Sequence, residues 1–400
     1  MPSFDLQTMK YDYIIAGSGC AGLSLLHSIL NERALYKKRI LVLDKDVKNQ
    51  NDRTWCFWEK EEGVFESIVH HKWKHLRFIS DDFSKKFDLR EYTYKMIRGI
   101  DFYSHVLDFA QKFENVDFIN EKILSIDDGG DSGIVKTEKG EYSAPIVFNS
   151  TPLFNPEISE KNSLLQHFEG WVIKTDEAVF DDKVGTLMDF TLDQKHGATF
   201  MYVLPTSANE ALVEYTLFSP RILNKEDYKT ALTDYIANTL QIDSYTILHE
   251  EFGVIPMSLA TFPRKAGKGN RIVNIGTAGG FTKASSGYTF QFIQKNVKQI
   301  IRELKDDIIP GKHIGFREKL YHWYDRTMLD VILSEKMEGK QIFEQIFKKL
   351  DAPQILAFLG NESSLGGELR IMSKLPILPF LTSGIKQLVS SNSSLSQNKK

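Results

Sequence analysis

The sequence predicts an α/β fold in which a parallel sheet is interrupted by a mostly antiparallel sheet and followed by C-terminal helices. Three observations support this prediction. Residues 11–45 fit a strand, a glycine-rich turn, a helix and a second strand, alternation typical of strands dominates residues 165–220, and a second glycine-rich segment begins at Gly276. Because the chain returns to a glycine loop after the antiparallel stretch, the first unit is expected to be discontinuous.

The N-terminal unit carries a dinucleotide-binding fingerprint. The strand Tyr13–Ala16 runs into Gly17, Gly19 and Gly22, and a second apolar strand ends at Asp44, 22 residues after Gly22. In this pattern the first glycine permits a tight turn, the second admits a pyrophosphate, and the third lets helix and strand pack closely. The helix N-terminus favours phosphate charge, and the acid accepts from a ribose hydroxyl. We expect a Rossmann-type domain that binds an ADP-containing cofactor; the alternative is a glycine-rich turn of another α/β protein.

Apolar periodicity and turn residues predict the elements that follow. Up to residue 149 we expect, in order, a hairpin across 73–89, a strand at 94–99, a helix at 101–112, a strand at 116–120, two strands within 122–143 and a strand at 144–149. Beyond it we expect strands at 170–175, 184–190, 199–205, 210–218, 250–257 and 270–276, and helices at 226–240, from about 290 to 305 and throughout 316–359. The tail from Ser390 is rich in Ser, Asn, Gln and Lys, which predicts disorder.

This order also predicts how the chain divides into domains. We expect a discontinuous cofactor domain at residues 8–55, 90–160 and 250–306, an inserted substrate-binding sheet domain at 56–89 and 161–249, a C-terminal helical region at 307–388, and a disordered tail at 389–400.

Composition narrows the function classes. The formal net charge of −3 does not indicate a nucleic-acid partner. Two cysteines, Cys20 and Cys56, support neither a disulfide framework nor a zinc site, so no metal is expected. The polar segment Met1 to Lys10 does not resemble a signal peptide, and no run of 18 apolar residues suggests a membrane-spanning helix. We expect a cytoplasmic protein.

Several segments together resemble one family. They are the N-terminal glycines with Asp44, Asn51-Asp-Arg-Thr-Trp-Cys-Phe-Trp58, Leu212-Val-Glu-Tyr-Thr216, Ile275-Gly-Thr-Ala-Gly-Gly-Phe-Thr-Lys-Ala-Ser-Ser-Gly-Tyr288 and Tyr324-Asp-Arg326. From about residue 10 to about residue 385 the chain resembles the bacterial-type lycopene β-cyclases, FAD-dependent carotenoid cyclases of the flavoprotein superfamily with the p-hydroxybenzoate hydroxylase fold. It departs from many members at Ala284, where they carry proline.

The resemblance implies an isomerase of the intramolecular lyase type. Lycopene, and then γ-carotene, would each have a linear ψ-end group closed to a β-ionone ring without net electron transfer. FAD would act in its reduced form, with NAD(P)H only as reductant. The residues implied at the cofactor are Gly17, Gly19, Gly22, Asp44, Arg53, Gly276, Gly279, Gly280, Thr282 and Gly287. The segment from Thr282 to Gly287 is expected to begin a helix whose N-terminus faces the flavin ring. For Arg53, a surface ion pair is the alternative.

Two acids are candidate catalytic residues. Glu214 lies between apolar neighbours on a strand, where burial would raise its pKa and keep its proton, and the family places an essential acid in this strand. The alternative is a solvent-facing position of an alternating strand. Asp189 would share a proton with Glu214 or bind the flavin edge, or it is an ordinary acid at a strand end. Aromatic candidates for cation stabilisation, with core packing as the alternative, are Trp55, Trp58, Trp171, Phe200 and Tyr202.

A hydrocarbon substrate resides in the membrane, so peripheral association with the membrane surface is expected. The apolar segment Leu375–Leu381 is a candidate contact, or alternatively the end of a packed helix. Two rival functions stay open: a flavin-dependent oxidoreductase of the same fold, such as a hydroxylase or prenyl reductase, and a flavin or carotenoid carrier without catalysis. Two features weaken the hydroxylase: Gly276-Thr277 stands where such enzymes often read Gly-Asp, and Asn149-Ser150 where they tend to read Asp-Gly.

Overall fold

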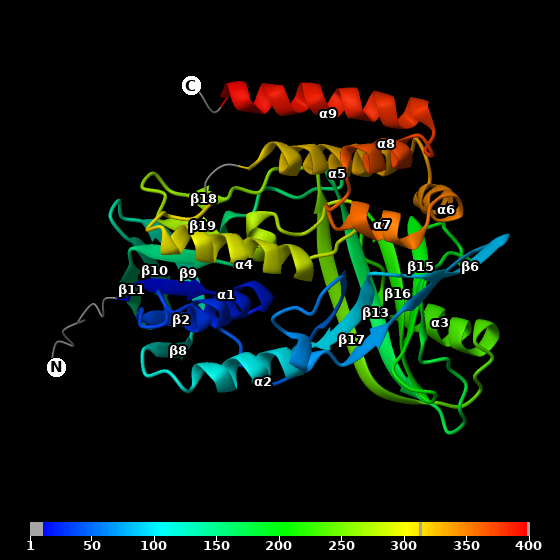
Figure 1. Ribbon diagram of the computed structural model, residues 1–400, viewed down its shortest axis with the longest axis horizontal. Coiled ribbons are helices and arrows are strands. Elements are labelled where there is room, and N and C mark those ends of the chain that lie inside the picture. The colour runs from blue at the N-terminus through cyan, green and yellow to red at the C-terminus, as the bar shows by residue number, and fades with distance from the viewer. Residues whose placement is uncertain (1–10, 312–313, 398–400) are drawn as a thin grey trace.

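The computed structural model describes residues 11–311 and 314–397, and within these ranges the strands form four sheets. Residues 8–10 and 398–400 of the expected domains, and the segment Met1 to Lys10, lie outside the described residues. Figure 1 shows the N-terminal unit at one end of the molecule, the long antiparallel strands at the other, and the C-terminal helices along one edge.

A six-stranded sheet forms the N-terminal unit. Its strands, in spatial order, are β18 (Lys265–Ala266), β19 (Ile272–Asn274), β12 (Ile146–Asn149), β1 (Tyr13–Ala16), β2 (Ile40–Asp44) and β8 (Val116–Asn120). All neighbours pair in parallel except the β18–β19 pair. Strands from three distant stretches of the chain therefore build one sheet, which confirms the Rossmann-type fold with a discontinuous first unit.

Both faces of this parallel sheet are covered. Ile15 and Val42 pack under the helices α1 (Cys20–Asn31), α2 (Gly99–Ala110) and α4 (Phe290–Lys305). Ile14 and Leu41 face the opposite way, onto a small sheet of β9 (Ile123–Asp128), β10 (Gly133–Thr137) and β11 (Glu141–Ala144). The two strands expected within 122–143 are therefore three, because a tight turn closed by the Thr137 N–H donating to the Gly140 carbonyl (2.9 Å) adds a second hairpin.

A seven-stranded sheet forms the other half of the molecule (Figure 1). In spatial order it contains β17 (Thr246–Ser258), β13 (Ser163–Lys174), β16 (Glu210–Ser219), β15 (Ala198–Pro205), β14 (Val184–Asp189), β5 (His75–Ser80) and β6 (Phe83–Asp88). Only the β14–β5 pair is parallel. The expected domain boundary at residue 250 falls inside β17, which pairs along its length with β13.

The two faces of the large sheet have different partners. One face packs against α3 (Lys225–Asp234) and the π-helical turn Tyr235–Thr239, which together replace the single helix expected at 226–240. The other face packs against the C-terminal helices and a small sheet of β3 (Thr54–Glu59), β7 (Thr93–Arg98) and β4 (His71–Trp73). This second face meets the N-terminal unit, and the candidate site lies there.

The C-terminal helices are α5 (Phe316–Leu333), α6 (Gly339–Lys349), α7 (Ala352–Leu359), α8 (Leu365–Met372) and α9 (Ile377–Gln397). Two turns interrupt the region expected to be helical throughout. The expected disorder from Ser390 was wrong as far as Gln397, because α9 continues through it and runs beside α5 (Figure 1). Lys386 of α9 forms an ion pair with the buried Asp330 of α5 (2.7 Å). No helix in the described part of the chain is long and apolar enough to span a membrane.

Two glycines of the first loop make a matched test of this packing. A Cβ on Gly22 would stand 2.0 Å from the carbonyl oxygen of Gly17, whereas a Cβ on Gly19 meets nothing within 4 Å. We expect Gly22→Ala to lower the free energy of unfolding by about 2 kcal/mol or more, because the clash outweighs a gain in helix propensity of about 1 kcal/mol. Gly19→Ala is expected to unfold like the wild type. Equal stabilities in urea titrations would contradict this packing.

Candidate functional site

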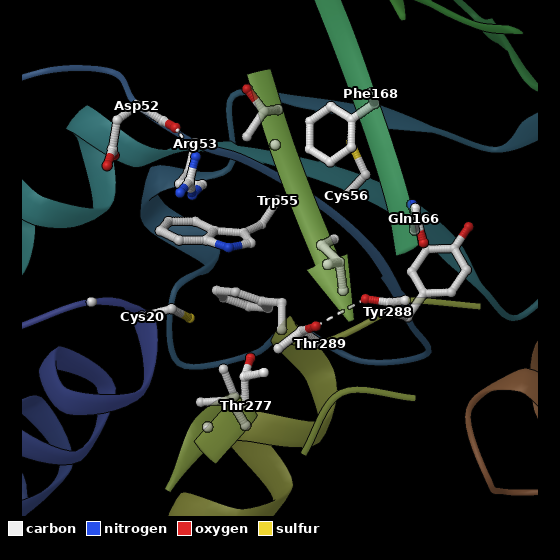
Figure 2. A pocket seen from close by; sticks show the side chains of 18 of the residues that line it. Cys20, Asp52, Arg53, Trp55, Cys56, Gln166, Phe168, Thr277, Tyr288 and Thr289 are labelled. Atoms are coloured by element: carbon white, nitrogen blue, oxygen red, sulfur yellow. Dashed lines mark hydrogen bonds between the residues drawn. The ribbon is translucent and has the colours of Figure 1, made fainter. Parts of the chain in front are cut away.

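A cavity of about 430 Å³ lies where the N-terminal unit meets the large sheet. Its wall is formed by the first glycine loop, the second glycine segment, β3 and the inner face of the large sheet. In Figure 2, Trp55 and Arg53 lie on one side of this space and Gln166 and Tyr288 on the other. The site therefore combines segments that are more than 200 residues apart in the sequence.

The first loop leaves room for an anionic ligand at the start of α1. Gly19 lines the cavity with open space where a side chain would stand. The first turn of α1 carries no acidic residue, and no side chain caps it, so the positive end of the helix dipole faces the cavity. Gly17 adopts a φ of +105°, and a Cβ there would stand 2.2 Å from Ser150 Oγ. This is a fitting cradle for a pyrophosphate.

Asp44 anchors this loop to the end of β2. Its Oδ2 accepts hydrogen bonds from the Ser18 N–H (2.7 Å) and Ser18 Oγ (2.9 Å), and its Oδ1 accepts from the Asp46 N–H (3.0 Å). Burial alone would raise its pKa, but these hydrogen bonds and the charge of Lys48 hold the pKa of Asp44 below its ordinary value. The carboxylate is therefore ionised, as an acceptor for a ribose hydroxyl would be. Asp44 is not among the residues lining the cavity, whereas Lys48 is.

The second glycine segment divides into two parts. Gly276 and Gly287 line the cavity, and Gly276 approaches α1 so closely that its Cβ would stand 2.7 Å from Ala21 Cβ. Gly279, Gly280 and Thr282 are not among its lining residues.

Gly279, Gly280 and Thr282 lie away from the cavity and fix the backbone shape of the second glycine segment. Gly280 adopts a φ of +72°, Gly279 packs against the Asn274 carbonyl, and Thr282 Oγ1 lies 3.0 Å from Thr277 Oγ1. The helix expected to begin between Thr282 and Gly287 begins instead at Phe290, because Gly287 has a φ of +71° and closes a turn.

Two polar side-chain atoms that line the cavity, Gln166 Oε1 and Ser286 Oγ, have no hydrogen-bond partner within the described residues. Both side chains are almost fully buried, with 7% of Gln166 and 4% of Ser286 exposed. Because buried polar groups are almost always paired, two such atoms on one cavity wall indicate a polar ligand. No pattern in the sequence had pointed to these unpaired polar atoms.

Glu214 is half-buried and lines the cavity from β16. Burial, and then the negative charge of Glu251, raise the pKa of Glu214 to about 8, against a hydrogen bond from Thr216 Oγ1 (2.8 Å) that lowers it. Burial also raises the pKa of Tyr288 to about 12 and takes that of Cys56 well above its ordinary value. Glu214 is thus a stronger acid than either of these neighbours, and it still keeps its proton at neutral pH.

Glu251 is an acid that sequence reasoning missed. It is 7% exposed, and its Oε2 accepts a hydrogen bond from Thr54 Oγ1 (2.6 Å). Burial raises the pKa of Glu251. The large sheet pairs Gly170 with Glu214 on one side and with Glu251 on the other. Only this cross-strand register brings the two acids together, so no local pattern could have identified the pair.

Asp189 does not join Glu214. It is 1% exposed, and its Oδ2 accepts from Tyr235 OH (2.7 Å) on the α3 side of the sheet. Its Oδ1 accepts from the N–H (2.9 Å) and the Oγ1 (2.7 Å) of Thr191. The expectation of a catalytic Asp189 is therefore corrected: its carboxylate secures the turn after β14 and is absent from the cavity wall.

The remaining candidate residues differ in whether they line the cavity or pack in the core. Arg53 lines the cavity, where its guanidinium donates to the Asp52 carbonyl (2.9 Å). Of the five aromatic candidates, Trp55 and Tyr202 line the cavity. The other three serve the core, and aromatic lining residues that sequence reasoning missed are Tyr94, Tyr103, Phe168, Tyr288 and Phe290.

The raised pKa of Glu214 predicts a pH-dependent stability. The folded state holds this proton up to about pH 8, whereas the unfolded chain releases it near 4.5. Between these values the unfolded state binds fewer protons, so the free energy of unfolding falls as pH rises. Glu214→Gln removes this contribution. We expect wild type to lose stability relative to the variant across this window in urea titrations, and parallel curves would contradict a buried, protonated Glu214.

Comparisons with known proteins find structures with a similar fold. The structure is similar to a flavoprotein/dehydrogenase from Cytophaga hutchinsonii, with 14% identity, a TM-score of 0.64, and coverage of 96% of this chain and 100% of that one. It is also similar to a variant of HpxO from Klebsiella pneumoniae complexed with FAD (14% identity, TM-score 0.62, coverage 88% and 98%). A third is a geranylgeranyl bacteriochlorophyll reductase-like protein from Thermoplasma acidophilum (13%, 0.59, coverage 91% and 96%).

At these identities the structural neighbours establish the fold alone. No curated protein sequence matches the chain. Among the residues that the structure describes, no three His, Cys, Asp or Glu side chains gather as a metal site requires. The family model for the lycopene cyclase protein matches residues 12–384. Since this match spans nearly the whole chain and includes both glycine segments and Glu214, the chain belongs to the lycopene cyclase family.

Proposed function

We propose that this protein is a lycopene β-cyclase that converts lycopene to γ-carotene and then to β-carotene. The observation that supports it most is a carboxyl that keeps its proton at neutral pH on the wall of a cavity shared by aromatic and nucleotide-cradling residues. An alkene is a very poor base, so protonating it requires a positioned acid shielded from water. Glu214 meets that requirement.

The reaction leaves the oxidation level of the substrate unchanged. Glu214 donates its proton to the terminal double bond of a ψ-end group, and the cation formed attacks the neighbouring double bond and closes a six-membered ring. Loss of one proton from the ring carbon then gives the β-ionone ring and restores the proton count. Tyr202, Trp55 and the aromatic rings beside them present π faces that would stabilise the cation.

We propose FAD as the cofactor. Gly19 and the start of α1 would hold its pyrophosphate, Asp44 its ribose, and Gly276, Gly287 and Gln166 would border its ring. The open space at Gly19 and the unpaired polar atoms opposite it support this assignment. Reduced FAD would supply an electron-rich ring beside the cation, or take part in proton transfer, with NAD(P)H as its reductant.

We propose that the protein takes its substrate from a membrane surface through α9. Ile377 and Leu378 are 78% and 72% exposed. At 100° per residue, the exposed apolar side chains of α9 share an arc of about 120°. These side chains are Ile377, Leu378, Leu381, Ile385, Leu388 and Val389. An apolar arc of this kind on a surface helix fits the interfacial region of a bilayer. Within the candidate segment Leu375–Leu381, Leu375 and Phe380 instead pack against the core.

The proposed activity predicts a colour change in a lycopene-accumulating bacterium. Expression of the wild type is expected to convert lycopene to β-carotene, and Glu214→Ala is expected to lower product about a hundredfold or more while the purified variant keeps its flavin. Glu177→Ala, an exposed acid of the same sheet domain, is the matched control and should keep full activity. Cyclised product from Glu214→Ala at the wild-type rate would exclude Glu214 as the acid.

Turnover by the purified protein separates the rival functions. A cyclase needs reductant only in catalytic amount, whereas a hydroxylase or prenyl reductase consumes one NAD(P)H per turnover. Stoichiometric consumption would favour the oxidoreductase, and bound lycopene without new product would favour the carrier.

The apolar arc of α9 predicts vesicle binding. The triple variant Ile377→Glu, Leu381→Glu and Ile385→Glu is expected to bind anionic phospholipid vesicles roughly tenfold more weakly in cosedimentation, because it places charge where apolar area would be buried. The control triple replaces Val64, Val179 and Ile222, which are 54%, 47% and 53% exposed, with Glu. Equal losses in the two triples would show that α9 is not the contact.

A further inference from the structure

We propose that Glu251 is the positioning residue that reloads Glu214: the two acids form a pair in the large sheet, and Glu251 carries protons from the solvent side to the cavity side. This inference rests on the proposed function, because Glu214 is taken as the acid that protonates the substrate. Glu251 itself does not line the cavity, so it would act through Glu214.

The first support is the register of the sheet. Gly170 of β13 stands directly between Glu251 of β17 and Glu214 of β16, and Tyr202 of β15 continues the row. Directly paired residues project to the same face of a sheet, so both acids project toward the same side. Their backbones are two strand spacings apart, roughly 10 Å. Two Glu side chains can span that gap, directly or through one water molecule.

The second support is the absence of a side chain between them. A Cβ on Gly170 would stand 3.1 Å from Leu212 Cδ1, the end of a flexible side chain, and 3.4 Å from both Cβ and Cγ of Glu214. The glycine is therefore not forced by the backbone or by a clash with Glu214. Its effect is to leave the space between the two acids without a side chain.

The third support is that the two acids open onto different spaces. Glu214 lines the cavity of about 430 Å³, whereas Glu251 lines a neighbouring, more open hollow of about 570 Å³ with Asn51 and His249. Asp52 and Arg53 line both spaces, so Glu251 stands at the border between this hollow and the cavity of Glu214. A carboxyl in that place can take a proton from water and pass one to its neighbour.

The charged and polar groups around Glu251 and Glu214 determine the direction in which the pKa of each acid shifts. Glu251 faces the Thr54 hydroxyl from β3 and the charges of Arg53 and His249, all of which favour its ionised form, while Asp52 opposes it. Glu214 feels the charge of Glu251 and the hydrogen bond of Thr216, and Tyr202, Tyr288 and Cys56 lie in its field. Because the negative charge of Glu251 raises the pKa of Glu214, the pair holds one negative charge more readily than two.

Protons are conserved over one catalytic cycle. Glu214 gives its proton to the substrate, which leaves both carboxyls ionised. Glu251 then takes a proton from water in the hollow and passes it to Glu214. The proton lost from the cyclised cation leaves to a base or to water, so one proton enters and one leaves for each ring formed.

Glu251→Gln tests this assignment, because Gln keeps the size and can still accept from Thr54 but carries neither the charge nor the exchangeable carboxyl proton. We expect a folded, flavin-containing protein whose kcat falls roughly tenfold or more. The alkaline limb of its pH profile should move down by roughly one pH unit, because the charge that raised the pKa of Glu214 is gone. Glu250→Gln, an exposed neighbour on the opposite face, should match the wild type in both.

The outcomes are separable. A fall in kcat with an unmoved alkaline limb would show that the charge of Glu251 does not act on Glu214 and would overturn the proposal, as would an unchanged kcat. The titration of Glu214, followed by isotope-edited infrared spectroscopy without substrate, gives a readout independent of cyclase activity. If wild type formed no ring but Glu251→Gln still lowered the pKa of Glu214, the proposed function would fail while the acid pair stood.

Discussion

The structure depends on keeping one carboxylic acid protonated away from water. Glu214 holds its proton because it is buried and because the negative charge of Glu251 lies across Gly170. Burial is the larger of these two effects, so any change that lets water into the cavity would turn Glu214 into an ordinary surface glutamate. The inner face of the large sheet, the small sheet of β3 and the two glycine segments all serve this exclusion.

The topology explains why the site lies at the junction. Ligands of open parallel sheets bind at the carboxyl ends of the strands, and the first loop follows β1 while the second follows β19. The close approach of Gly276 to Ala21 brings both loops to one wall. The inserted sheet then supplies the opposite wall with Gln166 and Glu214, so nucleotide cradle and acid face the same space. Neither half of the chain could form this site alone.

Sequence patterns predicted the features that depend on residues close together in the chain. The first loop and the discontinuous unit followed from glycine spacing and element order. Glu214 was singled out through the resemblance to the family, because the alternation of its strand alone favoured a solvent-facing position. Asp189 was misjudged because β14 is buried on both faces, so alternation gave no sign of which side its carboxylate takes. Glu251, Gln166 and Tyr94 depend on cross-strand register and on loops that meet in space. The helical tail depends on contacts such as Lys386 with Asp330, which composition does not reveal.

The most direct measurement is the protonation state of Glu214 itself. Infrared difference spectra between wild type and Glu214→Gln, recorded on the flavin-bound protein across pH, report whether this carboxyl carries a proton. The account predicts a protonated carboxyl at neutral pH that ionises near pH 8. A carboxylate already ionised at neutral pH, titrating near the ordinary glutamate value of about 4.3, would contradict it.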